Sequence, residues 1–328
     1  MSSTQEVTSG RVPDARGNPH RAGGKQSTGP KPERAKRRLP PLGRILAWLA
    51  LGAVLVATLF PFWWVLRTGL STTRSLPANA DSLLPADFTW GAFGRVLGLS
   101  TPEEARAEGG SGATMYFWLY LRNSIVVATL ITAGQVAFST LAAYAFARLR
   151  WPGRDTVFFL FLTAMMIPPI FTILPNFVLI KELGLLNTYA GVIAPYFFMT
   201  PFAVFFMRQF FLGVSREIEE AARIDGAGHF RIFTRIIIPM SAPSVATLAL
   251  LTYLNAWNEY LWPYLVGQEE GVRVLTVALS VFRQQTANGA PDWAGLMAAT
   301  GMSAFPMILL LLVFGRRVIN SIQFSGLK

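Results

Sequence analysis

The charged stretch at residues 219–230 is the part of this sequence whose residue types and spacing best suit chemistry. It reads EEAARIDGAGHF, and the letters IIIP follow at 236–239. Ser215 is a good N-cap, and the acidic residues after it are favoured by the positive end of a helix dipole. Gly226 supplies a bend that a bulkier residue would resist. The pattern predicts two short helices joined by a tight bend, with small and acidic side chains suited to contact with a partner protein.

Groups that catalyse reactions or bind metals are scarce in this chain. It has no Cys, which excludes thiol catalysis, disulfides and Cys-ligated metal sites. Its two histidines, His20 and His229, are too few and too far apart in sequence to suggest a metal centre. No constellation of Asp, Glu, His or Cys supports bond-breaking chemistry. We therefore expect no catalytic residue, no metal and no cofactor, and a chain that is not an enzyme.

The composition is that of a membrane protein. The 328 residues are 52% hydrophobic and 14% charged, whereas a soluble domain carries about a quarter charged residues. A helix that crosses a bilayer needs about 20 apolar residues. The sequence therefore predicts an all-α, polytopic membrane protein with a six-helix transmembrane domain at 45–320, and short tails at 1–44 and 321–328. The six predicted spans are residues 45–66, 125–147, 157–180, 189–207, 244–266 and 296–315.

The distribution of basic residues predicts the orientation in the membrane. Residues 1–44 hold ten Lys or Arg against three acids, and their Pro, Gly and Ser content indicates a disordered tail rather than a nucleic-acid arm. With this tail inside, 21 of the 29 basic residues fall on the inner side of six spans. Basic residues accumulate on the cytoplasmic side of membrane proteins. We expect a multi-pass protein of the cell membrane with both termini, and the charged stretch, in the cytoplasm.

The charged stretch also carries a specific spacing: E-A-A, three residues, Gly, nine residues, I-x-I-P. This spacing resembles the cytoplasmic coupling loop of the membrane subunits of binding-protein-dependent ATP-binding cassette (ABC) importers, which have Leu where this chain has Ile238. Asn258–Pro263 resembles maltose-type sugar permeases. Without these resemblances, an amphipathic interfacial helix explains the stretch as well. The resemblance implies that residues 215–239 seat in a cleft of an ATPase subunit. The residues it implies for this coupling loop are Glu220, Ala221, Ala222, Asp225, Gly226 and Pro239.

Polar residues inside the predicted spans are candidates for a translocation path. Asn255 and Glu259 are four apart and share a helix face, with Asn258 adjacent and Trp257 able to stack on a sugar ring. An acid at the centre of a membrane helix costs about 2.5–3.5 kcal/mol, so Glu259 should face the bundle interior or water. A position near the outer interface, capping a helix, fits Glu259 equally well. Pro168 must break the third span, either to line the path or only for packing.

Together, these features predict the permease subunit of an ATP-driven ABC importer, for a sugar or oligosaccharide, that couples ATPase motion to alternating access. The resemblance implies a second related permease subunit, two cytoplasmic ATPase subunits and an external solute-binding protein as partners, with membrane lipids around them and no nucleic acid. A permease for another polar solute, such as a polyol or glycerol phosphate, is the main alternative. An ion-coupled transporter would need more charges inside the membrane than Glu259 alone.

Overall fold

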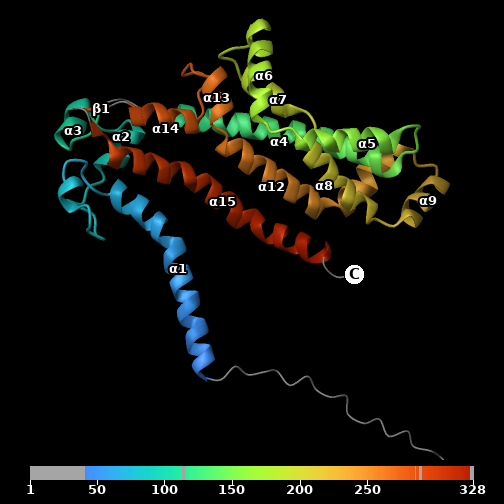
Figure 1. Cartoon of the computed structure of the whole chain (residues 1–328), viewed down its shortest axis with the longest axis horizontal. Helices are drawn as coiled ribbons and strands as arrows, with labels where there is room; N and C mark the ends of the chain where they lie inside the picture. The colour runs from blue at the N-terminus through green and yellow to red at the C-terminus, as the bar shows by residue number, and fades with distance from the viewer. Residues whose placement is uncertain (1–40, 113–114, 285, 288–289, 326–328) are drawn as a thin grey trace, which may run out of the picture. The chain divides into compact units, whose positions relative to one another are not determined.

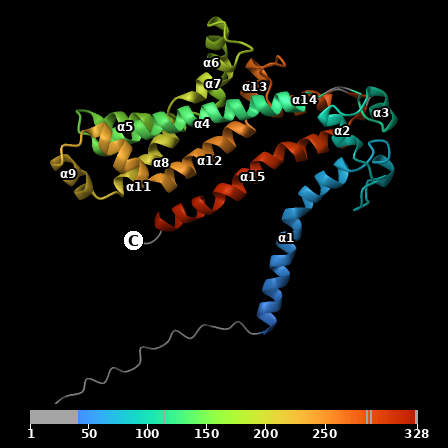
Figure 2. The same cartoon turned by 180° about the vertical axis from the view of Figure 1, so that it is seen from behind.

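A computed structural model of the chain is shown in Figures 1 and 2. Most of the predicted N-terminal tail and the last three residues lie outside the described residues. The last helix continues to Ser325, past the predicted start of the C-terminal tail at 321. The residues that the structure describes are 41–112, 115–284, 286–287 and 290–325.

Contacts divide the chain into two units, Met1–Val54 and Leu55–Lys328. The boundary falls inside α1 (Pro41–Gly69), which contains the predicted first span. The side chains of this helix are apolar on all sides and largely exposed, as expected for a helix that contacts lipid. Its last turn belongs to the second unit, where buried Arg67 donates to the carbonyl oxygens of Leu84 at 3.1 Å and Asn79 at 2.6 Å.

The second unit is built almost entirely of helices. Its small elements are the 3-10 turns Pro77–Asn79 and Ala164–Met166, the helices α2 (Gly91–Leu97) and α3 (Pro102–Ala107), and the two-residue strands β1 (Thr286–Ala287) and β2 (Ala290–Pro291), which pair antiparallel. Its larger helices are α4 (Phe117–Arg148), α5 (Arg154–Thr163), α6 (Ile170–Glu182), α7 (Tyr189–Phe197), α8 (Pro201–Leu212), α9 (Arg216–Ile224), α12 (Ala242–Asn258), α13 (Leu261–Val266), α14 (Leu275–Gln284) and α15 (Trp293–Ser325). Between α9 and α12 lie α10 (His229–Ile232), a π-helical turn (Phe233–Ile237) and α11 (Ile238–Met240).

Among the described residues, three helices are long and apolar enough to cross a membrane alone: α1, α4 and α15. Three further pairs meet the same criteria together but are bent, α5 with α6 by 98°, α7 with α8 by 45°, and the segment His229–Met240 with α12 by 80°. If each pair is one span, up to six spans are present. Six predicted spans are compatible with this count, but the third and fourth are broken rather than straight, and the fifth bent pair begins at His229, before the predicted start of the fifth span at 244.

Prolines and capping residues explain these breaks. Pro168 and Pro169 lie between the two halves of the third span, where Pro removes a backbone donor and clashes with the preceding turn, as the sequence predicted. In the fourth span, the side chain of Thr200 accepts a bond from the backbone N–H of Ala203 and starts α8 afresh, with Pro201 in its first turn. The fifth predicted span stops at Asn258 and resumes as α13 after two non-helical residues.

The centre of the unit is α4, which packs along α8, α12 and α7 (Figures 1 and 2). Three apolar clusters follow its length. The cluster at its C-terminal end contains Ala147, Met207 and Phe211, all 2% exposed or less. At its crossing with α7, a Cβ on Gly134 would lie 2.5 Å from the ring of Phe197, so only glycine fits there.

At the opposite end of α4, a buried ion network fixes the long loop between α1 and α4. Arg95 of α2 lies 2.5 Å from the carboxylate of Glu108 and 3.2 Å from that of Asp292. Asp292 also accepts hydrogen bonds from Thr73 Oγ1 at 2.7 Å and from the backbone N–H of Gly295 at 2.8 Å. The start of α15 and this long loop are therefore one ordered assembly.

Candidate functional site

The charged stretch forms the two short helices that the sequence predicts. Ser215 Oγ accepts a hydrogen bond from the backbone N–H of Glu217 at 3.2 Å, which confirms it as the N-cap of α9. The helix ends at a Schellman motif: the N–H of Gly226 bonds to the carbonyl of Arg223, and that of Ala227 to the carbonyl of Ala222. Gly226 has φ +80°, a value that residues with a side chain adopt only with strain. The predicted bend is therefore at Gly226.

The second helix of the stretch continues through Pro239 to Met240. Pro239 cannot donate a backbone hydrogen bond to the preceding turn, and the π-helical turn ends two residues before it, at Ile237. A π turn shifts the hydrogen-bond register by one residue, which accommodates the proline without ending the helix. The break before α12 comes at Ser241, with Pro243 in the first turn of α12.

The two sides of α9 differ sharply in exposure. Glu219 is buried and Ala222 packs against the apolar cluster at the end of α4, whereas Glu220, Ala221 and Asp225 are exposed. Two large apolar side chains beside the bend are also exposed, Ile224 by 87% and Phe230 by 74%. Five of the six predicted coupling residues, Glu220, Ala221, Asp225, Gly226 and Pro239, are therefore exposed, and Ala222 turns inward.

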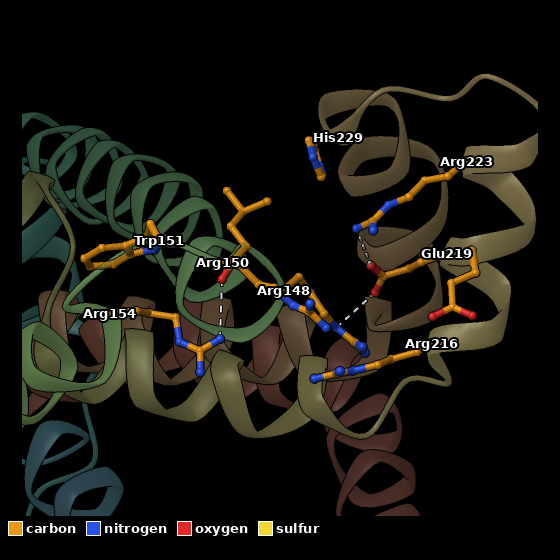
Figure 3. Close-up of a pocket in the computed structure, with 10 residues that line it drawn as sticks. Arg148, Arg150, Trp151, Arg154, Arg216, Glu219, Arg223 and His229 are labelled. Carbon is orange, nitrogen blue, oxygen red and sulfur yellow. Dashed lines mark hydrogen bonds and ion pairs between the residues drawn. The ribbon is translucent and has the colours of Figure 1, made fainter.

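Glu219, next to the predicted Glu220, holds α9 against the membrane-spanning helices (Figure 3). Its carboxylate Oε1 lies 3.0 Å from Arg148 Nε, and the two side chains are 5% and 3% exposed. The contact does not have hydrogen-bond geometry, so its attraction is mainly Coulombic. The other carboxylate oxygen, Oε2, lies 3.8 Å from Arg223 Nη2, one turn later on α9.

Arg148 joins three helices through one guanidinium group. It is the last residue of α4, it faces Glu219 of α9, and its Nη2 donates to the backbone carbonyls of Phe211 and Val214, the latter at 2.5 Å. Phe211 lies in the last turn of α8 and Val214 in the turn after it, where helix carbonyls lack the usual i+4 partners of their own helix. This buried Arg, with two backbone acceptors and one carboxylate beside it, thus ties α9 to the ends of α4 and α8.

Sequence reasoning missed this link, although a signal for it existed. Glu219 and Arg223 are four apart, and Arg148 directly follows a predicted span. Glu220 and Glu219 differ by one helix step of about 100°, so they cannot share a role. The sequence alone does not predict that the end of the second span packs next to the charged stretch.

A second candidate site is a cleft of about 170 Å³ between α4, α7, α8 and α12. Asn255 and Glu259 meet there, as predicted from their spacing. Gln135 of α4 donates from Nε2 to Thr200 Oγ1 at 2.8 Å across this cleft. The other residues that line it are Ile131, Tyr196, Thr252 and Ala256. The amide of Gln135, a polar group in the middle of an apolar span, was the signal in the sequence that α4 lines this cleft.

Glu259 both faces a cleft and caps a helix, two roles that the sequence presented as alternatives. It follows the last residue of α12, faces the cleft, and its Oε1 accepts a hydrogen bond from the backbone N–H of Trp262 at 3.2 Å. It therefore caps the start of α13, where the helix dipole favours a negative charge. The break after Asn258 makes this possible, because a continuous helix would not free that N–H group.

The remaining predicted path residues lie outside this cleft. Trp257 is 7% exposed, belongs to an apolar cluster with Phe282, and stacks on Tyr253 with ring centroids 6.1 Å apart. Two residues along a helix correspond to about 200°, which places Trp257 opposite Asn255. Asn258 is exposed and donates to the carbonyl of Leu254 at 2.8 Å. Pro168 is exposed at the break between α5 and α6. Within the described residues, no cluster of His, Cys, Asp or Glu could hold a metal ion.

A family model decides the class of protein. The family of binding-protein-dependent transport system inner membrane components matches residues 135–323. The chain belongs to this family. The predicted ABC importer permease is thereby confirmed, and such a permease works with an ATPase and a binding protein.

Individual relatives agree with the family assignment. The trehalose/maltose transport system permease protein MalG of Thermococcus litoralis is 32% identical over 88% of this chain and 98% of its own. The sn-glycerol-3-phosphate transport system permease protein UgpE of Yersinia pestis is 35% identical over 82% of this chain and 91% of its own. A crystal structure of a bacterial ABC transporter involved in the import of the acidic polysaccharide alginate covers 88% of this chain and 99% of its own at a TM-score of 0.70 and 23% identity. That match confirms the predicted all-α permease fold.

We expect replacement of Glu219 by Gln to loosen α9. Removing one partner of a buried ion pair leaves an uncompensated charge, at a cost of about 3–5 kcal/mol. Hydrogen exchange of the α9 amides should become faster, and the midpoint of thermal unfolding should fall. Glu217→Gln, on the exposed side of the same helix, is the matched control and should change neither. Equal exchange rates in the two variants would show that the Arg148 contact does not hold the helix.

Proposed function

We propose that this chain is one permease subunit of an ATP-driven importer for a saccharide, and that it forms its pathway with a second, related permease subunit. Its own role is mechanical, and ATP hydrolysis takes place in the separate ATPase subunits. The observation that carries this proposal is the two-sided helix α9. One side exposes Ile224 beside Gly226, and the other is fixed by the Glu219–Arg148 pair.

The exposed side of α9 and the bend suit a groove on an ATPase subunit. Large apolar side chains that stand in water are stabilised when a partner covers them. Ala221 allows close approach, and Glu220 supplies a charge for a basic partner on the ATPase. When the ATPases close on ATP, the groove carries the loop with it.

The buried side of α9 passes this motion to the cleft. Arg148 ties α9 to the ends of α4 and α8, and Gln135 ties α4 to the start of α8 through Thr200. The paired helices α4 and α8 therefore move as one wall. The other wall, α12, is joined to the end of the same loop through the 80° bend at Ser241. Motion of the loop changes the separation of the two walls, which is the basis of alternating access.

The chemistry of the cleft favours a neutral, polyhydroxylated solute. Its polar groups are two amides, two hydroxyls, a phenol and the carboxylate of Glu259, and no Lys or Arg of the described residues lines it. Amides and hydroxyls both donate to and accept from sugar hydroxyls. Glycerol phosphate, named for the Yersinia pestis relative, is a second candidate, but a lone carboxylate repels an anion. The trehalose/maltose relative supports a saccharide.

The positive-inside distribution supports a cell-membrane protein with α9 and both termini in the cytoplasm. Because the chain has no cysteine, single-cysteine variants test this cleanly. In right-side-out vesicles, a membrane-impermeant maleimide should label Leu99→Cys directly and Arg235→Cys only after permeabilisation. Both positions are exposed. The reverse pattern would invert the orientation and remove α9 from the reach of ATP.

Glu220→Lys and Gly226→Val should abolish ATP-dependent uptake while membrane insertion stays intact. The first reverses the charge of the docking surface, and the second forces a β-branched residue into φ +80°. Gly228→Val is the matched control, because Gly228 has φ −73° and open space around its Cα. Uptake of labelled maltose and trehalose into vesicles, with copurification of the ATPase subunits, provides the readout. Unchanged uptake in both variants would remove the coupling assignment.

Asn255→Leu should reduce saccharide uptake, whereas Asn258→Leu should have little effect. The first amide lies in the cleft and the second bonds outside it. Loss of one hydrogen bond to a solute corresponds to about a tenfold loss of transport efficiency. Uptake rates are compared at equal amounts of assembled transporter. An equal loss in both variants would place the path elsewhere.

A further inference from the structure

An arginine-lined cleft of about 600 Å³ lies between the turn after α4 and helix α9 (Figure 3). A neighbouring recess of about 570 Å³ shares four of its lining residues, Arg150, Trp151, Arg154 and Arg216. We propose that this arginine cleft binds the phosphate headgroup of an anionic phospholipid. The proposal goes beyond solute transport and does not depend on the coupling role of α9.

The charge balance of the cleft favours an anion. Five arginines line it and its neighbouring recess, against the carboxylates of Glu219, Glu220 and Asp155. Arg148 and Arg223 share Glu219, and Arg154 lies 2.9 Å from Asp155. Arg150 and Arg216 form no ion pair with any described residue. Two guanidinium groups thus remain to hold a phosphate, whose oxygens match their planar, bidentate donors.

The cleft lies at the depth of lipid headgroups. The 32 residues of α4 span about 48 Å at 1.5 Å per residue. A bilayer measures about 40–45 Å with its headgroup layers. When α4 crosses the membrane, its last residue, Arg148, therefore falls in a headgroup layer. Trp151 follows directly, and Trp is the residue type enriched at this interface.

An apolar surface continues from the cleft along α5. This helix begins at Arg154, and three large apolar side chains within its first two turns are exposed: Val157 by 45%, Phe159 by 65% and Leu160 by 60%. Acyl chains along this surface would bring their headgroup to the cleft. Basic pockets between membrane helices bind anionic headgroups in this way. An acidic protein would match the charge of the cleft but would leave the apolar surface unused.

The decisive experiment measures lipid retention by the assembled transporter in native mass spectrometry. Phosphatidylglycerol is added to the detergent-solubilised complex, with phosphatidylcholine as the neutral comparison. We expect the wild-type complex to retain phosphatidylglycerol preferentially. Each basic residue near an anionic surface strengthens lipid binding about fivefold. The double variant Arg150→Gln/Arg216→Gln should therefore weaken that retention about thirtyfold. Equal retention of both lipids by the wild-type complex would overturn the proposal without any variant.

Two controls are needed. One distinguishes binding in the cleft from a general effect of surface charge, and the other distinguishes a bound lipid from bound free phosphate. Arg231→Gln/Arg235→Gln removes the same charge from exposed positions outside the cleft and should leave retention unchanged. Equal loss in the two double variants would show a general surface effect and refute the site. Excess inorganic phosphate should fail to displace the lipid, and displacement would assign the cleft to a soluble anion instead. If the cleft variant does not assemble, Arg216→Gln alone provides the comparison.

Discussion

The burial of one charged side chain, Arg148, is the constraint on which the end of the helix bundle next to α9 depends. A buried guanidinium needs partners for its donors and for its charge. It finds them in the carbonyls of Phe211 and Val214 and in the carboxylate of Glu219. Because these partners come from α8, the turn after it and α9, satisfying Arg148 fixes their mutual positions. The helix α9, whose other side is exposed, is thereby fixed to the ends of the spans.

The irregular parts of the fold lie around the rigid pair α4 and α8. The helices α1, α4 and α15 are continuous, whereas the third, fourth and fifth spans are broken. Irregular backbone at membrane depth is tolerated only where protein or a water-filled cavity covers it. Two breaks satisfy this condition at the small cleft, since Thr200 and Glu259 both line it and both cap the helix that follows. The breaks therefore supply the polar groups of the cleft.

Local chemistry could be predicted from the sequence, and long-range pairing could not. The cap at Ser215, the bend at Gly226, the break at Pro168 and the shared face of Asn255 and Glu259 depend on neighbours within a few residues. The link from Arg148 to Glu219 depends on the packing of α4 against α8, which no spacing encodes. Trp257 shows the same limit: its place near a polar pair suggested a sugar contact, but helix geometry turns it toward the core.

The strengths of the two contacts of α9 explain how it could transmit force. On the proposed docking, burial of Ile224 and Phe230 would contribute about 1.5–3 kcal/mol each. Removing one partner of the buried pair on the other side, which leaves a buried charge uncompensated, costs about 3–5 kcal/mol. The two outer side chains together contribute about 3–6 kcal/mol, which is similar to the value for the buried pair. Neither contact should therefore break much more easily than the other. If the Glu219–Arg148 contact were much weaker, α9 would move with the ATPase without moving the spans. If the docking contact of Ile224 and Phe230 were much weaker, the ATPase would move without α9. Matched contacts on opposite sides of a short helix are what a coupling element requires.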